Sequence, residues 1–150
     1  MCLGNIFCAL GKALGGCNEL TPNLRPSGTI DINEMSSILL NKLDEMGDDH
    51  AELYLADVNC KAYRKDEVKK FLNLADVDKI TFVAEEHDCD DFAADLYGKG
   101  VPLLWTSKHA LNWFTDIDTL ILWFIEPQTC KISQTLEDWQ GWDCRFFLNR

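Results

Sequence analysis

The chain has 150 residues with a formal net charge of -11, which comes from 25 acidic and 14 basic residues. This length suits a single domain that buries its own hydrophobic core. The negative field repels phosphate backbones, so nucleic acid is not expected as a partner, and no apolar stretch approaches the ~20 residues that a membrane span needs.

The N-terminal part is predicted to lie outside the folded domain. Residues 1–28 form an apolar arm and a linker, and residues 29–150 form the domain. Within residues 1–17 the only positive charge is Lys12, which lies inside the apolar stretch and not ahead of it, so a signal peptide is not expected. Thr21 to Gly28 holds two prolines and a glycine, as linkers do. A mobile or packed arm is therefore favoured over membrane insertion.

The first half of the domain is predicted to be mainly helical. Hydrophobic residues at helical spacing predict a helix over 32–46, with Gly47 as its stop signal, and a second helix over 63–74. Short runs with strand-like alternation predict strands over 51–58 and 79–83.

A third helix, over 88–98, carries signals at both ends. Asp88 is the expected N-cap, Asp91 follows three residues later, and Gly98 suits the C-terminal turn. Cys89 therefore falls in the first turn of this helix. Thiolates are favoured there by the helix dipole and by unsatisfied backbone N–H groups, and the same groups can hold an oxyanion.

The rest of the chain is predicted to be rich in β-structure. Strands are expected over 109–114, 119–125, 128–132 and 144–148, with a hairpin turn at 116–118. Helices come first and an antiparallel sheet follows, an order that indicates an α+β fold.

Two residues of this sheet complete a candidate catalytic set with Cys89. His109 opens the first strand and Glu126 ends the next one. Pairing through the predicted turn places His109 opposite roughly residue 125, which brings Glu126 beside it. A nucleophilic thiol, an imidazole base and an orienting carboxylate are the parts that acyl transfer needs.

Three strings carry a resemblance to a known family: Asp-Cys-Asp-Asp-Phe-Ala at 88–93, His-Ala-Leu-Asn-Trp at 109–113 and Ile-Glu-Pro-Gln-Thr at 125–129. Together they resemble the C-terminal domain of the fairy-ring mushroom (Marasmius oreades) agglutinin and related small proteins of bacteria and phages. The resemblance spans roughly residues 60–150 and implies a papain-like, calcium-dependent cysteine protease, with Cys89 as nucleophile, His109 as base and Glu126 as the orienting carboxylate. Nothing in the chain resembles the mushroom protein's sugar-binding domain, so lectin activity is not implied.

Acidic residues crowd the predicted nucleophile: Glu85, Glu86, Asp88, Asp90, Asp91 and Asp95. Carboxylates oppose a thiolate, and a bound divalent cation would reverse this effect. Calcium suits clustered carboxylate oxygens, and the resemblance makes Asp90 and Asp91 its expected ligands. The alternative is that Asp88 and Asp91 only cap the helix while the other acidic residues are solvated.

The expected function is therefore a calcium-dependent papain-like cysteine hydrolase, a peptidase that acts on a protein or peptide substrate. Gln128 is a candidate support for the oxyanion or the site, or simply a turn residue. Two alternatives remain open: a transglutaminase- or amidase-type acyl transferase, and a catalytically silent calcium-binding interaction module of phage or bacterial origin.

The seven cysteines indicate free thiols. Their number is odd and no pair has CxxC spacing, so neither a complete disulfide framework nor a zinc ribbon is expected. Most are expected to act as small buried hydrophobic residues in a reducing compartment, which predicts a cytoplasmic location.

Overall fold

The structure is a computed structural model that describes residues 23–136 and 143–147. The predictions for the arm over residues 1–22, for Trp139, for Trp142 and for strand residue Leu148 lie outside the described residues. Among the described residues, no helix has the length and apolar character to cross a membrane. The proposed boundary between residues 28 and 29 stays a prediction.

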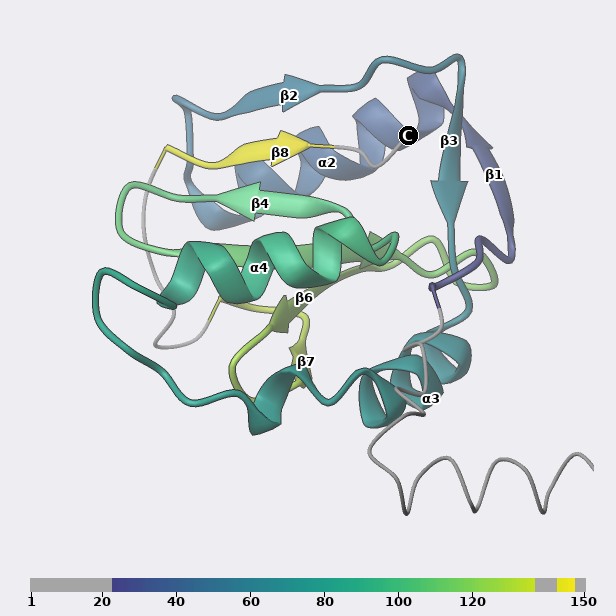
Figure 1. The fold of residues 1–150 in the computed structure, drawn as a ribbon. Helices are drawn as coiled ribbons and strands as arrows, with labels where there is room; N and C mark the ends of the chain where they lie inside the picture. The colour runs from purple at the N-terminus through teal and green to yellow at the C-terminus, as the bar shows by residue number, and fades with distance from the viewer. Residues whose placement is uncertain (1–22, 137–142, 148–150) are drawn as a thin grey trace, which may run out of the picture.

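The core of the fold is a six-stranded sheet with the strand order β2-β8-β4-β5-β6-β7 (Figure 1). Its strands are β2 (Glu52–Tyr54), β4 (Leu103–Trp105), β5 (Ala110–Thr115), β6 (Leu122–Glu126), β7 (Lys131–Ser133) and β8 (Arg145–Phe147). Every neighbouring pair is antiparallel except β2 and β8, which run parallel. With its helices, this sheet confirms the predicted α+β class; a papain-like architecture is not shown.

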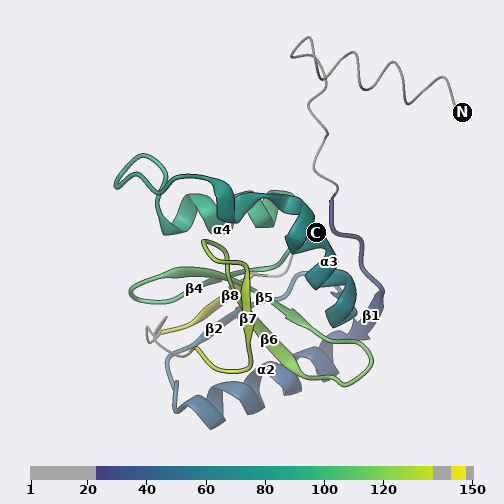
Figure 2. The same cartoon turned by 90° about the horizontal axis from the view of Figure 1, so that it is seen from below.

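Two helices cover opposite faces of the sheet, α2 (Ile32–Met46) and α4 (Cys89–Gly98) (Figure 2). Helix α2 buries Met35, Leu39 and Leu43 in the cluster that holds Trp113 and other sheet residues. On the other face, α4 buries Phe92, Ala93 and Leu96. Apolar residues at helical spacing on each helix explain why both settle on the sheet.

The remaining elements close one end of the sheet. They are β1 (Gly28–Asp31), β3 (Asn59–Ala62), α3 (Lys65–Ala75) and the 3-10 turn η1 (Val77–Lys79). Strands β1 and β3 form a separate antiparallel ribbon in which Ile30 faces Cys60. Helix α3 packs Val68, Phe71 and Leu72 into a second cluster that also contains Phe92 of α4.

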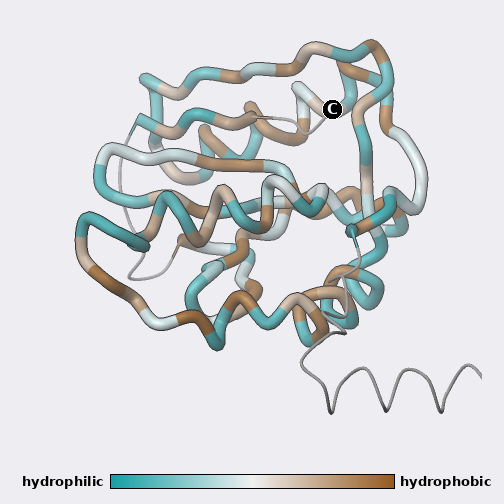
Figure 3. Tube along the Cα trace, viewed as in Figure 1, coloured by the Kyte–Doolittle hydropathy of each residue, from teal (hydrophilic) through white to brown (hydrophobic). Residues whose placement is uncertain are grey.

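The predicted strand over 79–83 is wrong. The segment leaves η1 as a loop, and its one ladder contact is an isolated bridge between Val83 and His87. Ile80, Phe82 and Val83 are all exposed, because no neighbouring strand in the described part of the chain covers their alternating pattern. Figure 3 shows that the loop before α4 includes a run of hydrophobic residues.

Other element predictions were right in kind but not in extent. The three predicted helices are present as α2, α3 and α4, whereas the predicted strand 51–58 shrinks to β2. Strand β4 lies between the predicted helix over 88–98 and the predicted strand over 109–114, where no strand was predicted, and β1 and β3 were also missed. An apolar run of three residues such as that of β4 is too short for periodicity to identify a strand.

The register of the β5–β6 hairpin differs from the predicted one by three residues. Asn112 faces Ile125, where the prediction placed His109 roughly opposite that residue. The connection between β5 and β6 is longer than the predicted turn at 116–118. Within it, the Asp116 N–H donates to the Ile121 carbonyl, and Leu120 adopts a positive φ of 58°.

Candidate functional site

The N-terminus of α4 is organised by a capping box. Asp88 is the N-cap, as predicted, and its Oδ1 accepts the Asp90 N–H at 3.4 Å. Asp91 reaches back, with Oδ2 accepting the Asp88 N–H at 3.2 Å. This reciprocal pair satisfies two otherwise free backbone donors and fixes Cys89 as the first helical residue.

Cys89 is half-buried between an apolar floor and carboxylates. Its side chain packs against the buried cluster of Ala93, Leu103 and Ala110. Its Sγ and carboxylate oxygens of Asp88 and Asp90 lie within 4.8 Å of one another. The thiol therefore lies in an acidic environment, which repels a second negative charge.

His109 and Glu126 are in direct contact. The imidazole Nε2–H donates to Glu126 Oε2 at 2.7 Å, and Glu126 Oε1 accepts the Gln128 N–H at 3.2 Å. Glu126 is only 4% exposed, so the two bonds compensate for burial of its carboxylate. The backbone of His109 is also held, because Thr106 Oγ1 accepts the His109 backbone N–H at 3.0 Å.

This contact forms in spite of the register error. Extending the observed pairing puts Glu126 opposite Leu111, two residues from His109. Diagonal neighbours of this kind lie ~7–8 Å apart at their backbones, which long side chains can bridge. Gln128 contributes through its backbone N–H and not through the side chain that the sequence suggested.

The structure does not join the thiol to the imidazole. Cys89 and His109 make no hydrogen bond with each other in the described part of the chain, and the thiol instead lies beside Asp88 and Asp90. Of the predicted set, His109 and Glu126 are therefore hydrogen-bonded to each other, and within the described residues Cys89 is not bonded to either of them.

The acidic helix end contains the groups that could hold a metal ion. Hydrogen bonding to Asp88 raises the pKa of Asp90, and the charges of Asp88 and Asp91 add to the rise. The pKa of Asp88 is lowered, chiefly by its bond with Asp90. Of the two predicted ligands, Asp90 belongs to the close set of Asp88, Cys89 and Asp90, whereas Asp91 is engaged in the cap.

The other free cysteines of the described residues fit a structural role. Cys60 and Cys144 are fully buried, and burial raises the pKa of both thiols. Burial also raises the pKa of Cys130 to about 11. A buried thiol with a raised pKa is a poor nucleophile. The reducing, cytoplasmic compartment stays a prediction.

Three aromatic side chains near this site were not identified as a set from the sequence. We call them the aromatic platform: Tyr54 of β2, Phe147 of β8 and Trp105 of β4. The rings of Tyr54 and Phe147 stack with centroids 4.8 Å apart and planes within 3° of parallel. Trp105 meets Phe147 edge-on at 5.3 Å. Only the long-range strand order brings them together, so no local motif could have revealed the set.

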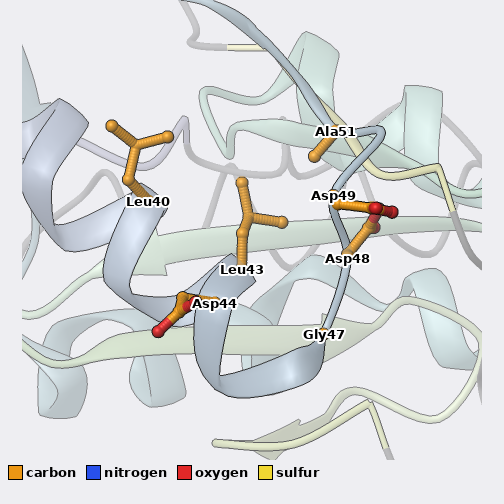
Figure 4. A pocket seen from close by; sticks show the side chains of 7 residues that line it. All are labelled: Leu40, Leu43, Asp44, Gly47, Asp48, Asp49 and Ala51. Carbon is orange, nitrogen blue, oxygen red and sulfur yellow. The ribbon is translucent and has the colours of Figure 1, made fainter.

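A hollow of about 360 Å³ lies elsewhere, at the C-terminal end of α2. It is lined by Leu40, Leu43, Asp44, Gly47, Asp48, Asp49 and Ala51. Figure 4 shows that Asp44 lies on the opposite side of the hollow from Asp48 and Asp49. The carboxylates do not converge on one point, so the hollow lacks the geometry of a cation site.

Two solved structures share this fold at low sequence identity. The Polyporus squamosus lectin bound to the human-type influenza-binding epitope Neu5Acα2-6Galβ1-4GlcNAc is 23% identical, with a TM-score of 0.54, over 64% of this chain and 42% of the lectin chain. A structure described as the PSL1a–E64 complex is 20% identical, with a TM-score of 0.63, over 79% of this chain and 51% of that chain. The chain thus spans about half the length of the proteins it matches. No family model matches the sequence, and no curated protein matches it.

These findings correct the expected activity. The Polyporus squamosus structure that shares the fold is described as a lectin, so the hydrolase, cysteine-protease and catalytic-triad assignments are corrected and are not carried further. The likeness is to a fungal lectin at the level of the fold; the finer resemblance to the Marasmius oreades agglutinin is not shown.

Proposed function

We propose that this chain is a non-catalytic binding module and that its ligand is a carbohydrate. The observation that carries the proposal is the fold it shares with the Polyporus squamosus lectin, which is described as bound to an oligosaccharide epitope. The earlier alternative, an interaction module that keeps the scaffold without catalysis, agrees with this reading. The resemblance of three sequence strings to the C-terminal domain of the Marasmius oreades agglutinin stays a separate proposal, because that resemblance does not imply lectin activity.

The side chains around the α4 N-terminus support a binding role. Ligand sites are mostly apolar and carry a few fixed polar groups. Here Ala93, Leu103 and Ala110 form an apolar floor beside Cys89. His109 is fixed by Glu126 through Nε2, which leaves Nδ1 for a ligand hydroxyl. A rigid polar group next to an apolar floor suits a sugar, which presents hydroxyls and C–H faces together.

The test is isothermal titration calorimetry of the full chain with two oligosaccharides, Galβ1-4GlcNAc and Neu5Acα2-6Galβ1-4GlcNAc. Saturable binding of at least one of them is expected, because the proposed site is preformed. Free glucose, which lacks the linkage, serves as the control ligand. A flat titration with both oligosaccharides would overturn carbohydrate binding.

The non-catalytic part of the proposal has its own test. Incubation of the chain with an unstructured protein such as casein is expected to leave the protein intact, with calcium or with chelator. The matched variant is Cys89→Ala. Cleavage by the unmodified chain that disappears in this variant would contradict a non-catalytic module.

Calcium binding at the acidic end of α4 is a separate proposal. Its support is the close set of Asp88, Cys89 and Asp90, together with the raised pKa of Asp90 beside neighbouring carboxylates. A cation would relieve that repulsion, and carboxylate oxygens are the ligands that calcium prefers. Asp91 would contribute by holding the helix cap rather than the ion.

A further inference from the structure

The loop between η1 and α4 presents apolar side chains to the solvent. Residues 80–83, which we call the hydrophobic loop, include Ile80, Phe82 and Val83 with exposed fractions of 42%, 54% and 42%. Apolar side chains gathered in this way on one short exposed segment are typical of a surface that another segment covers.

The backbone of the hydrophobic loop is held at both ends. The Ile80 N–H donates to the Val77 carbonyl at 3.1 Å, and Val77 is buried in the cluster that α3 and α4 share. At the other end, the Val83 N–H donates to the His87 carbonyl at 3.0 Å, and the His87 N–H donates to the Val83 carbonyl at 2.8 Å. The three apolar side chains therefore lie on an anchored backbone, and covering them costs little additional ordering of the loop.

The chain carries an apolar segment of its own ahead of the first described residue. Residues 1–17 have a large apolar side chain every three or four residues, at Leu3, Phe7, Leu10 and Leu14. The described chain starts close to the hydrophobic loop in the fold, because Leu24 is buried in the same cluster as Val77. The connection over residues 18–23 can span about 20 Å when extended, so residues 1–17 can reach the surface around that cluster.

The charges around the loop suit this segment. Glu85 and Glu86 follow the loop with exposed side chains, and neither forms an ion pair within the described part of the chain. Lys12 is the one charged side chain among residues 1–17, and its sign is opposite to that of the two glutamates. A negative border attracts a cationic segment and repels an acidic partner or an anionic lipid surface.

We propose that residues 1–17 pack on the hydrophobic loop of the same molecule. The apolar side chains of this segment cover Ile80, Phe82 and Val83, and Lys12 lies toward the glutamates that follow them. Asp88, the N-cap of α4, comes directly after the turn that Val83 closes. The packed segment therefore borders the candidate site at the N-terminus of α4.

The test measures how fast iodoacetamide alkylates Cys8 in the full chain, with the modified thiol identified by mass spectrometry. Cys8 follows Phe7 in the apolar segment, so packing on the loop should shield its thiol. Phe82→Ser is expected to speed this alkylation about tenfold, since it removes the largest apolar side chain of the loop. Leu40→Ser is the matched control and should leave the rate unchanged, because Leu40 is 56% exposed on α2, which covers the opposite face of the sheet from α4 (Figure 2).

Hydrogen exchange of the hydrophobic loop is the reciprocal measurement. The Thr81 and Phe82 backbone N–H groups have no hydrogen-bond acceptor among the described residues, so slow exchange there requires another segment to cover them. Slow exchange is expected in the unmodified chain and faster exchange in Leu10→Ser, which weakens the apolar segment without changing the loop.

Several outcomes would overturn the proposal. One is that Cys8 reacts equally fast in the unmodified chain, in Phe82→Ser and in an isolated peptide of residues 1–17. Another is protection of Cys8 that disappears on dilution of the protein, because the segment would then cover the loop of a second copy. Binding to phosphatidylcholine vesicles that is lost in Phe82→Ser, without protection of Cys8 in solution, would assign the loop to a lipid surface instead. Far-ultraviolet circular dichroism of each variant identifies any change that comes from unfolding.

Discussion

Glu126 illustrates how one buried carboxylate organises a site through two hydrogen bonds. Its two oxygens divide their roles, one holding the His109 ring and the other the Gln128 backbone. A single buried residue therefore fixes the strand end and the imidazole together. The same geometry that suggests a catalytic dyad from the sequence also serves a rigid ligand contact.

Asp90 is the residue on which the calcium proposal is tested. Calcium should raise the melting temperature of the unmodified chain, because an ion that binds only the folded state stabilises it. Asp90→Asn should abolish most of that rise, since it removes one charged oxygen from the set. Differential scanning fluorimetry with calcium chloride and with chelator measures both.

The control for this measurement is Asp118→Asn. Asp118 is an exposed carboxylate that pairs with Arg64 and lies in the β5–β6 turn, away from α4. It should leave the calcium effect unchanged. A rise that persists in Asp90→Asn, or none in the unmodified chain, would contradict a calcium site at this helix end.

At the scale of elements, the chain turns tightly after α4, and Gly100 is the residue that allows it. Gly100 has a φ of 104°, and a Cβ there would lie 2.7 Å from the Leu24 carbonyl oxygen. Gly100→Ala combines a backbone conformation that side chains avoid with a clash against fixed backbone. We expect it to lower the free energy of unfolding by more than about 1 kcal/mol, measured by urea denaturation.

Gly98 provides the matched comparison two residues earlier. It is the last residue of α4, its backbone is not in the positive-φ region, and a Cβ would meet nothing within 4 Å. Gly98→Ala should therefore be neutral or slightly stabilising, because alanine loses less backbone freedom on folding. Equal destabilisation by both substitutions would contradict the role assigned to Gly100.

The elements that the sequence predicted well are those with local signals. Helices α2 and α4 carry their apolar stripes and their caps within one segment, so periodicity was sufficient. Strands β1 and β3 lack such signals: residues such as Asn59 and Lys61 are poor strand formers, and the two segments become strands by pairing with each other. Tertiary pairing, not local preference, decides these elements.

For the site as well, features with local signals were predicted and features that depend on tertiary packing were not. The cap at Asp88 and the meeting of His109 with Glu126 were predicted, because each depends on short-range order along one helix or one hairpin. The position of the Cys89 thiol relative to His109 depends on how α4 packs on β4 and β5. The spacing of residues along the sequence does not predict that packing.

At the scale of the whole molecule, an early strand and the last strand of the described chain meet in one sheet. β2 pairs in parallel with β8, which places Tyr54 beside Phe147 although the two lie far apart in the sequence. No motif in the sequence predicts this pairing of β2 with β8. It creates the aromatic platform, which is therefore a property of the complete fold rather than of any segment.

Asp48 connects the segments that lead into β2 and β8 through two hydrogen bonds. Its Oδ2 accepts the Cys144 N–H just before β8 at 2.9 Å, and its Oδ1 accepts the His50 N–H ahead of β2 at 3.3 Å. The carboxylate is only 8% exposed. Burial by itself would raise its pKa, but the hydrogen bonds from Cys144 and His50 outweigh burial and hold the pKa below its usual value of 3.8.

The sign of the resulting pH dependence follows from that shift. A carboxyl group whose pKa is lower in the folded state stabilises the fold above its unfolded pKa, and the contribution disappears as the pH falls through the folded value. Asp48→Asn keeps the size and one acceptor oxygen but removes the charge. It should lower the free energy of unfolding by about 1 kcal/mol at neutral pH, the difference between charged and neutral hydrogen bonds.

Urea denaturation of the unmodified chain and of Asp48→Asn, repeated between neutral pH and pH ~2, measures this dependence. The gap between the two proteins should begin to narrow as the pH falls through the unfolded pKa of 3.8, and it should close only below the lower folded-state pKa, where the Asp48 carboxyl is protonated in both states. Asp49→Asn is the control, because the neighbouring Asp49 side chain is 87% exposed and should show no gap at any pH. A constant gap down to the lowest pH would mean that Asp48 joins β2 and β8 through its shape alone, and that its charge contributes nothing to the junction that carries the aromatic platform.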